Sequence, residues 1–284
     1  MKLVQVWKNN SHALGIQVEK GVIDVTAERA RRGLAAPGPW PKPSLWVNLV
    51  WTCLRSCLTG RSASPMPPGP GGHRHGPHLL HQPELPPARQ GVRPAPPPAP
   101  VLFNKFSNAL AAHGDRVRLM PDYKEYDYEA ELVVVMGRNA RDVSVDEALD
   151  YVYGYTCGND LSCRDLQFTR GGQWVLSKTF DGFAPVGPCL VPAGELDPAN
   201  LDISSVVNGE TRQSSNTSDM IFSAAQIIAD LSHHFTLQPG DLIFTGTPQG
   251  VMHGYPADQK NWRKPGERVS VTIQGIGTLS TSFC

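Results

Sequence analysis

Two glutamates stand two residues apart at the start of an apolar strand. The segment YDYEAELVVVMG, residues 126–137, is rich in β-branched and aromatic residues and ends in glycine, which is typical of a β-strand. Side chains two residues apart lie on the same face of a strand, so Glu129 and Glu131 share a face with Val133 and Val135. Two carboxylates about 7 Å apart beside an apolar layer repel each other and lose hydration. A cation, a shared proton or a basic partner would each offset that cost.

A third acidic residue falls where a second strand is expected to end. In YGYTCGNDLSCRDLQ a strand pattern gives way to a short helical turn, and Asp160 lies at the junction. With Glu129 and Glu131 it would form a site of oxygen ligands only. Mg²⁺, Ca²⁺ and Mn²⁺ prefer such ligands, whereas Zn²⁺ prefers His and Cys. The alternative from spacing alone is an exposed acidic strand face, because Asp127 continues the same row.

Basic and hydroxyl groups follow this acidic pair along the chain. Arg164 and Gln167 lie three apart on one helical side, and a guanidinium can bind a carboxylate through two hydrogen bonds. Lys178, in LSKTFDGFAPVGP, has apolar neighbours and could stabilise an enolate beside a metal. The loop TGTPQGV, residues 245–251, could hold an oxyanion or a carboxylate. Taken singly, a surface ion pair, a lysine with its stem packed on apolar surface and an ordinary turn are the alternatives.

The composition favours one large domain or a domain with an appendage. The chain has 284 residues, 26 of them basic and 26 acidic, and its formal net charge of zero argues against a nucleic-acid or anionic-membrane partner. Six scattered Cys without a C-x-x-C pair favour reduced thiols inside a cell. The N-terminus lacks a signal-peptide pattern, and the most apolar run, residues 44–58, is too short to span a bilayer. We therefore expect a soluble, intracellular protein.

Three regions differ in pattern. Residues 1–28 alternate like a small antiparallel β segment, and residues 101–284 predict one α+β domain that is mostly β. In that domain Ser144/Glu147 and Ser223/Gln226 predict two capped helices, and Asn208-Gly209 predicts a hairpin turn. Residues 29–100 are rich in Pro, Gly and Arg, which predicts a disordered or polyproline-like stretch. A solvated linker is the simplest interpretation of it, and a ligand for SH3- or WW-type domains is an alternative.

Five segments, in this order, resemble the fumarylacetoacetate hydrolase family. They are YEAELVVVMGR, GYTCGNDLSCRDLQ, LSKTFDGFAPVGP, VNGETRQSSNT and PGDLIFTGTPQGV. The likeness covers about residues 101–284 and extends faintly to residues 2–26. It implies a fumarylacetoacetate-hydrolase-like mixed β-sandwich roll, usually a homodimer, with a divalent metal in a cleft.

The resemblance also implies roles for individual residues. Glu129 and Glu131 match the family's E-x-E metal ligands, and Asp160 matches the ligand in its N-D-x-S-x-R-D segment. Lys178 matches the family's active-site lysine. The positions near the substrate are matched by Arg164, Gln167 and Thr247. A cation would make the glutamate pair tolerable, and Mg²⁺ is the expected metal, with Ca²⁺ and Mn²⁺ as alternatives.

The residues and the resemblance predict the same chemistry. A divalent ion would chelate a small 2-oxo acid or 1,3-dicarbonyl, such as an acylpyruvate or oxaloacetate, and would stabilise its enolate with help from Lys178. The expected activity is hydrolysis, or decarboxylation, at a C–C bond. Many members of the family are mitochondrial, but no Arg-rich presequence is recognisable here, so mitochondrial and cytoplasmic locations both remain open.

In one respect the sequence departs from the family. Hydrolytic C–C cleavage also needs a general base, and the family carries a His and a Glu in a lid segment of the type G-x-N-Y-x-x-H ahead of residue 101. No N-Y-x-x-H occurs in this chain, and the candidates to replace it are His78, His81 and Glu84. We hypothesise that about residues 30–90 derive from an alternative reading frame or retained non-coding sequence. The alternative function is then a catalytically impaired, metal-binding member of the family.

Overall fold

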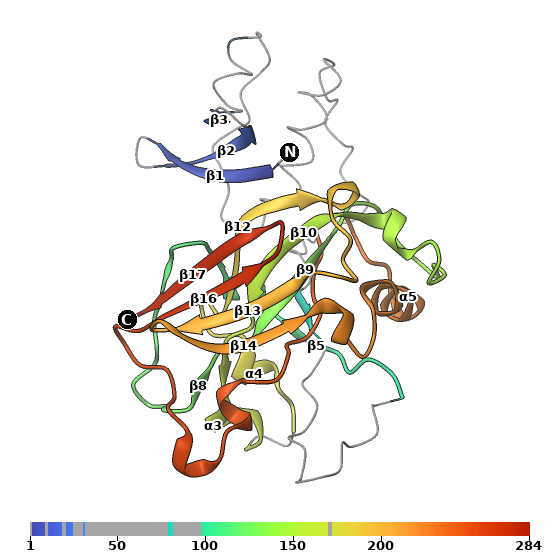
Figure 1. Ribbon diagram of the computed structural model, residues 1–284. Coiled ribbons are helices and arrows are strands. Elements are labelled where there is room, and N and C mark those ends of the chain that lie inside the picture. Colours follow the sequence, from blue (N-terminus) through green and yellow to red (C-terminus); the bar gives the residue numbers. More distant parts are fainter. Residues whose placement is uncertain are drawn as a thin grey trace, which may run out of the picture.

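The computed structural model describes residues 2–8, 11–18, 21–24, 31, 79–81, 98–169 and 172–284, with side chains chiefly from residue 98 onward. Its described part is built mainly from two sheets that face each other (Figure 1). Among the described elements, strands outnumber helices, and the longest of these helices has 11 residues. The predicted α+β class with a predominance of β-structure is therefore confirmed.

The larger sheet has ten strands in the order β3-β2-β1-β12-β10-β9-β15-β4-β5, with β6 paired to β12. Most neighbours are antiparallel, whereas β4 runs parallel to β15 and β6 runs parallel to β12, so the sheet is mixed. The strands of this sheet are β1 (Lys2–Lys8), β2 (Ser11–Val18), β3 (Gly21–Asp24), β4 (Leu79–His81), β5 (Phe103–Lys105), β6 (Leu110–Ala112), β9 (Ala130–Met136), β10 (Val152–Asn159), β12 (Ala184–Pro192) and β15 (Leu242–Phe244).

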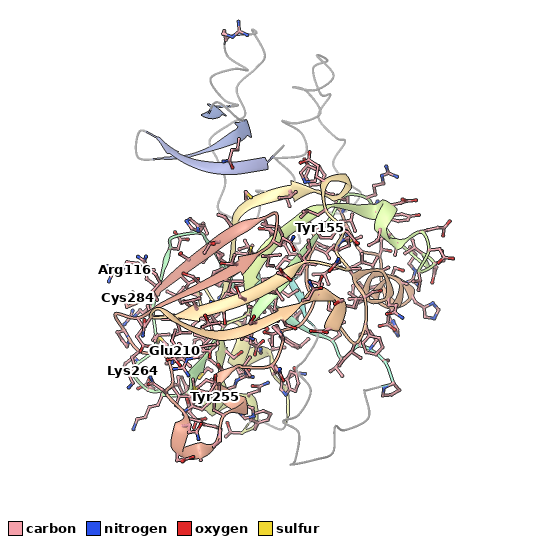
Figure 2. All side chains as sticks on the ribbon, in the orientation of Figure 1. Arg116, Tyr155, Glu210, Tyr255, Lys264 and Cys284 are labelled. Carbon is pink, nitrogen blue, oxygen red and sulfur yellow. The ribbon has the colours of Figure 1, made fainter. Side chains whose placement is uncertain are left out.

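The second sheet has five strands in the order β14-β13-β16-β17-β7. The predicted turn at Asn208 and Gly209 joins β13 to β14, and both residues have the positive φ, 49° and 91°, that such a two-residue turn requires. Arg116 and Cys284 lie close together in Figure 2, where β7 pairs with the end of β17. The strands of this sheet are β7 (Arg116–Val117), β13 (Asp202–Val207), β14 (Glu210–Asn216), β16 (Arg268–Ile273) and β17 (Gly277–Phe283).

A short ladder of β8 (Tyr126–Asp127) and β11 (Ser162–Cys163) lies beside the short helices α3 (Arg164–Gln167) and α4 (Val175–Lys178), at one end of the sheets (Figure 1). The long helix α5 (Ala224–His234) begins with the predicted capping box of Ser223 and Gln226. The remaining short helices are η2 (Ser107–Ala109), η3 (Ala148–Tyr151), η4 (Ala193–Glu195), η5 (Thr217–Asp219), η6 (Met252–Gly254) and η7 (Ala257–Gln259).

The helix expected after Ser144 does not form as an α-helix. Ser144 Oγ does donate to Glu147 Oε2 at 2.8 Å, but the segment makes turns and the 3₁₀-helix η3. Ala148 is buried there, whereas Leu149 is 37% exposed and Val152 already belongs to β10. The prediction of a capped α-helix at this position was therefore wrong, because Ser144 does not cap the backbone and the 3₁₀-helix η3 passes directly into β10 at Val152.

Strand β9 is buried on both faces. Ala130, Leu132 and Val134 pack into the large core shared with the second sheet. Val133 and Val135 point the other way, into a smaller cluster that includes Leu242 and Phe244 of β15. This alternation confirms that Glu129 and Glu131 approach the apolar face formed by Val133 and Val135.

The proposed division at residues 28 and 100 remains a prediction. Strand β1 pairs with β12, so the N-terminal segment extends the sheet of the main domain. Of residues 29–100, the structure describes only residue 31, β4 and residues 98–100, and β4 pairs with β15 and β5. His78 and Glu84 lie outside the described residues. No helix within the described ranges is long and apolar enough to cross a membrane.

Gly158 allows two apolar side chains to pack beside the acidic residues. It lies opposite Glu131 in the β9–β10 ladder, and a Cβ at this position would come within 2.5 Å of both Phe244 and Val133. We expect Gly158→Ala to lower the free energy of unfolding by about 1–3 kcal/mol, because overpacking forces side chains off their rotamers. Denaturant unfolding measures this. Gly194→Ala is the control, since no atom lies within 4 Å of that Cβ, and an equal loss in both variants would contradict the argument.

Candidate metal centre

Three buried carboxylates converge between β9 and β10. Glu129, Glu131 and Asp160 each offer a ligand atom, and these atoms lie within 4.8 Å of one another. The antiparallel register pairs Glu131 with Gly158, and the backbone N–H of Asp160 donates to the carbonyl of Glu129 at 2.9 Å. The strand pairing thus brings together residues about 30 positions apart in sequence. Because all three side chains are buried, and Asp127 as well, the alternative of an exposed acidic strand face is excluded.

Lys178 bridges two of the three carboxylates. Its Nζ donates to Glu129 Oε1 at 2.7 Å, to Glu129 Oε2 at 2.8 Å and to Asp160 Oδ2 at 2.9 Å. Helix α4 supplies this side chain, and the ammonium group also lies 5.1 Å from the centroid of the Phe103 ring. Trp174 packs edge-on against Phe103, so the lysine is enclosed by aromatic surface. In such dry surroundings, attraction between its charge and the carboxylates is stronger than in water.

A second lysine, Lys105 at the end of β5, fixes the other oxygen of Asp160. Its Nζ forms an ion pair with Asp160 Oδ1 and also donates to the backbone carbonyls of Leu161, at 3.2 Å, and Phe183. Burial lowers the pKa of Lys105, and the ion pair with Asp160 opposes that shift. The carbonyl partners come from the loop after β10 and from the start of β12. Lys105 therefore holds Asp160 in place relative to the backbone around it.

Arg164 organises the other side of the site. Its Nε donates to Asp127 Oδ2 at 3.0 Å, its Nη2 donates to Glu129 Oε1 at 2.8 Å, and its Nη1 donates to Gln167 Oε1 at 2.7 Å. The carboxylate of Asp127 also accepts the backbone N–H groups of Met252 and His253, both at 2.8 Å. Arg164 thus joins α3, the acidic row and the loop that carries η6.

Glu131 is the residue whose charge is least compensated. Its Oε2 accepts the backbone N–H of Gly246 at 2.8 Å, but its buried Oε1 has no hydrogen-bond partner among the described residues. Burial raises the pKa of Glu131 well above its ordinary value, and the nearby charges of Asp160 and Glu129 raise it further. A buried carboxylate oxygen without a donor, beside two other carboxylates, is what a cation would satisfy.

The residues present fit a divalent cation with oxygen ligands. Each carboxylate has one oxygen that is bonded to a group other than Lys178. Asp160 Oδ1 binds Lys105, and Glu131 Oε2 binds the N–H of Gly246. Glu129 Oε1 accepts from Ser162, at 2.9 Å, and from Arg164. A cation bound by one oxygen from each would keep further coordination positions for water or substrate, as Mg²⁺ and Mn²⁺ sites commonly do. The set contains no His or Cys, which disfavours Zn²⁺.

The structure brings the predicted site residues into one region. Five of them, Glu129, Asp160, Lys178, Arg164 and Gln167, belong to one hydrogen-bonded network, and Glu131 places a carboxylate oxygen within 4.8 Å of those of Glu129 and Asp160. Thr247 lies one residue beyond Gly246, whose N–H binds Glu131. His81 is in β4, paired with Phe244, and its side chain lies outside the described residues. The roles of these residues remain proposals.

Sequence reasoning missed Lys105, Asp127, Ser162 and Gln213. Lys105 stands between apolar residues in LFNKFS, which is the same signal that singled out Lys178. Asp127 shares the strand face of Glu129 by alternation, so its burial was predictable once that face was known to be buried. Ser162 and Gln213 lie in two of the segments that carry the family resemblance, but their contacts could not be read from the sequence, because Ser162 binds Glu129 and Gln213 binds Ala130 across long sequence separations.

We expect Glu131→Gln to weaken the binding of Mg²⁺ and Mn²⁺ at least about tenfold. Replacement of a residue that only hydrogen-bonds to a metal ligand already lowers metal affinity by about that factor. The same change should leave the metal-free Tm unchanged or higher, because it removes a poorly compensated buried acid. Calorimetric titration and thermal unfolding with and without metal test both expectations. Asp150→Asn, at an exposed carboxylate, is the matched control. Unaltered metal affinity in Glu131→Gln would remove Glu131 from the site.

The two buried lysines should respond differently to metal. Lys105→Met should cost about 3–5 kcal/mol of unfolding free energy, because it leaves buried Asp160 Oδ1 and two carbonyls without their donor. Lys178→Met should be destabilising without metal and largely rescued by Mg²⁺, since the oxygens that Lys178 binds are those a cation would coordinate. Denaturant unfolding with and without Mg²⁺ measures this, with exposed Lys124→Met as control. Equal rescue of both variants would show that Lys105 has no separate structural role.

Known proteins share this fold and site region. The family described as fumarylacetoacetate (FAA) hydrolase C-terminal matches residues 82–283. The chain is 43% identical over 194 residues to the fumarylacetoacetate hydrolase domain-containing protein 2 homolog of Dictyostelium discoideum, and 42% identical over 184 residues to the mitochondrial oxaloacetate tautomerase Fahd2a of Rattus norvegicus. Each match covers 64% of this chain, and 63% and 58% of the respective relative, so the chain matches less than two thirds of the length of either.

Solved structures agree with these matches. Fumarylacetoacetate hydrolase from Exiguobacterium antarcticum aligns over 100% of this chain and 99% of its own, with a TM-score of 0.78 and 26% identity. Fumarylpyruvate hydrolase from Pseudomonas aeruginosa, solved in complex with Mn²⁺ and pyruvate, aligns over 78% of this chain and 98% of its own, with a TM-score of 0.64 and 32% identity. The predicted fumarylacetoacetate-hydrolase-like fold is thereby confirmed. From its matched residues and its fold, this chain belongs to the fumarylacetoacetate hydrolase family.

Proposed function

We propose that the chain is a divalent-metal-dependent enzyme that converts small 2-oxo acids through their enolate forms. The observation that carries the proposal is the buried Oε1 of Glu131, which has no hydrogen-bond partner in the part of the chain that the structure describes, beside Glu129 and Asp160. The relatives support the substrate class, because one is named an oxaloacetate tautomerase and another was solved with Mn²⁺ and pyruvate. Mg²⁺ or Mn²⁺ is the expected metal, and Ca²⁺ is the third candidate.

Glu129, Glu131 and Asp160 would hold the cation. When bound, a divalent cation supplies Lewis-acid stabilisation of the negative charge that develops on the oxygen of an enolate. Lys178 contributes a second positive charge at Nζ, in a site that its aromatic neighbours keep dry. The loop from Gly246 to Thr247, next to Glu131, is positioned to receive the carboxylate of the substrate.

Tautomerisation of a 2-oxo acid such as oxaloacetate is the reaction that this site supports best. It transfers one proton between the carbon beside the carbonyl and the carbonyl oxygen, and it breaks no C–C bond. We assign Lys178 the transfer of that proton: its ammonium group, beside Glu129 and Asp160, would donate a proton from Nζ to the enol carbon and regain the proton that leaves the enol oxygen, so that the lysine ends as it began. Arg164 and Gln167 would orient Glu129 and the substrate.

Hydrolysis of the C–C bond of an acylpyruvate, or decarboxylation of oxaloacetate, is the second candidate. The fumarylpyruvate hydrolase relative favours hydrolysis, and its cleavage product would also leave as an enolate. Hydrolysis further requires a base that activates water, and the replacements for it, His78, His81 and Glu84, have no described side chains. Tautomerisation has no such requirement. A member that binds metal but lacks turnover is the remaining alternative, and a homodimer remains the expected assembly.

We expect the purified chain to accelerate enol–keto exchange of oxaloacetate in the presence of Mg²⁺ or Mn²⁺. Asp160→Ala should lower the rate at least about 100-fold, because loss of metal-based charge stabilisation costs several kcal/mol. The decay of enol absorbance reports tautomerisation, and a coupled assay for pyruvate reports decarboxylation and acylpyruvate hydrolysis. Asp150→Ala is the control at an exposed acid.

Each outcome of this assay separates the candidates. Pyruvate release at a rate that exceeds tautomerisation would favour the C–C bond reactions. Metal binding with no turnover on any of these substrates would establish the impaired alternative. Equal rates in Asp160→Ala and the parent would overturn the assignment of the site.

A further inference from the structure

Gln213, on β14, is a buried amide that connects three parts of the structure. Its side chain is 1% exposed. Its Oε1 accepts the backbone N–H of Ala130 at 3.0 Å and the hydroxyl of Ser205 at 2.9 Å. Its Nε2 donates to Thr247 Oγ1 and to the carbonyl of Pro248, both at 2.8 Å. The amide thus ties the hairpin of the second sheet to the acidic strand and to the loop after β15.

The orientation of this amide is fixed by its partners. The backbone N–H of Ala130 can only donate, so the atom that faces it must be the oxygen. The carbonyl of Pro248 can only accept, so the atom that faces it must be the nitrogen. The NH₂ group has two hydrogens, and one is used by Pro248. The other must therefore point to Thr247 Oγ1, which becomes an acceptor in this bond.

This direction has a consequence for the hydroxyl of Thr247. A hydroxyl has one hydrogen, and since Oγ1 accepts from Gln213, its own hydrogen has to point elsewhere. Thr247 is half-buried, and its hydroxyl donates to no group within the described ranges. The preceding residue, Gly246, donates its N–H to Glu131 Oε2 at 2.8 Å. Thr247 therefore directly follows a residue that binds one of the three carboxylates.

We propose that Gln213 is a positioning residue that commits the Thr247 hydroxyl to donate a hydrogen bond to the carboxylate of a 2-oxo acid in the metal centre. The inference rests on the proposed function and specifies which protein group recognises the carboxylate of the substrate. Without Gln213, Thr247 could turn its hydrogen toward the protein and present a lone pair, which repels a carboxylate. A donor set in advance costs no reorganisation when the substrate binds.

The surroundings keep this arrangement rigid. Tyr128 donates its hydroxyl to the carbonyl of Gly250 at 2.9 Å, which holds the far end of the loop. Arg212, the neighbour of Gln213, forms an ion pair with Glu210 at 2.8 Å and lies 5.6 Å from the ring centroid of Tyr255. Figure 2 labels Glu210 and Tyr255 at the same end of the molecule. The loop is thus held by Glu131 before Thr247, by Gln213 at Thr247 and Pro248, and by Tyr128 at Gly250.

The test is a double-mutant cycle on the full chain. Gln213→Glu keeps the acceptor for the Ala130 N–H but removes both N–H donors of the amide. Thr247→Val removes the hydroxyl at nearly constant shape. The third variant combines the two changes. Thr247→Ser retains the hydroxyl and serves as the conservative control. Calorimetry with saturating Mn²⁺ measures the binding of pyruvate and of acetylacetone, a dicarbonyl chelator that lacks a carboxylate. Mn²⁺ affinity and Tm are measured on every variant without ligand.

We expect Gln213→Glu and Thr247→Val each to weaken pyruvate binding about tenfold, the size of one hydrogen bond to a charged group. The double variant should bind pyruvate less than about twofold more weakly than Thr247→Val alone, because both changes remove the same hydrogen-bond donor. Acetylacetone binding and Mn²⁺ affinity should stay within about twofold of the parent, and Thr247→Ser should bind pyruvate like the parent.

Several results would overturn the inference, and they differ from failure of the proposed function. Independent losses of pyruvate binding that multiply in the double variant would mean that Gln213 does not act through Thr247. Equal losses for pyruvate and acetylacetone, or a matching loss of Mn²⁺ affinity, would show a purely structural role. Absence of coupling between the two changes in Tm would disprove the hydrogen bond itself. A parent chain that binds Mn²⁺ but not pyruvate would overturn both this inference and the proposed substrate class.

Discussion

The mutual repulsion of three buried carboxylates is the constraint on which the rest of this structure depends. Glu129, Glu131 and Asp160 present atoms within 4.8 Å of one another in a region from which water is largely excluded. Such a cluster persists only where positive charge and hydrogen-bond donors offset the cost of burial. Lys105 and Lys178 supply part of that positive charge. Glu131 Oε1 has no hydrogen-bond partner among the described residues, which indicates that the negative charge of the cluster is not fully offset without a cation.

The two sheets can be understood as the frame that holds this cluster. The β9–β10 register sets the spacing of the carboxylates, and a glycine opposite Glu131 leaves room for the apolar layer behind them. Strand β15 ends where its following loop can reach Glu131 through a backbone N–H. The hairpin of β13 and β14 then fixes that loop through Gln213. Glu131 lies in core strand β9, Glu129 directly precedes that strand and Asp160 directly follows β10, whereas Arg164 and Lys178 belong to short helices at one end of the sheets.

The sequence predicted the parts of this site that depend on local pattern. Strand alternation placed Glu129 and Glu131 on one face, Asn208-Gly209 marked a turn, and Ser223 marked a helix start, all as observed. A capping signal at Ser144 misled, because the serine hydroxyl bonds the Glu147 carboxylate instead of capping a helix, and only the 3₁₀-helix η3 follows. The contacts of Lys105 could not be predicted, because its partners lie 55 or more residues away along the chain. Apart from Ser205, the partners of Gln213 lie 34 or more residues away. Only the pairing of the strands brings these residues together.

The two lysines on Asp160 show how one charge pattern can serve two purposes. Lys105 is also held by two backbone carbonyls, which no metal ion replaces, so its ammonium group stays where the fold puts it. Lys178 binds oxygens of Glu129 and Asp160 that a cation would coordinate, so cation and lysine compete for them. Binding of a cation would therefore weaken the hold on Lys178 and turn its donors toward a substrate. By this argument the same lysine would stabilise the acidic cluster without a cation and, in the proposed reaction, would assist the chemistry with one.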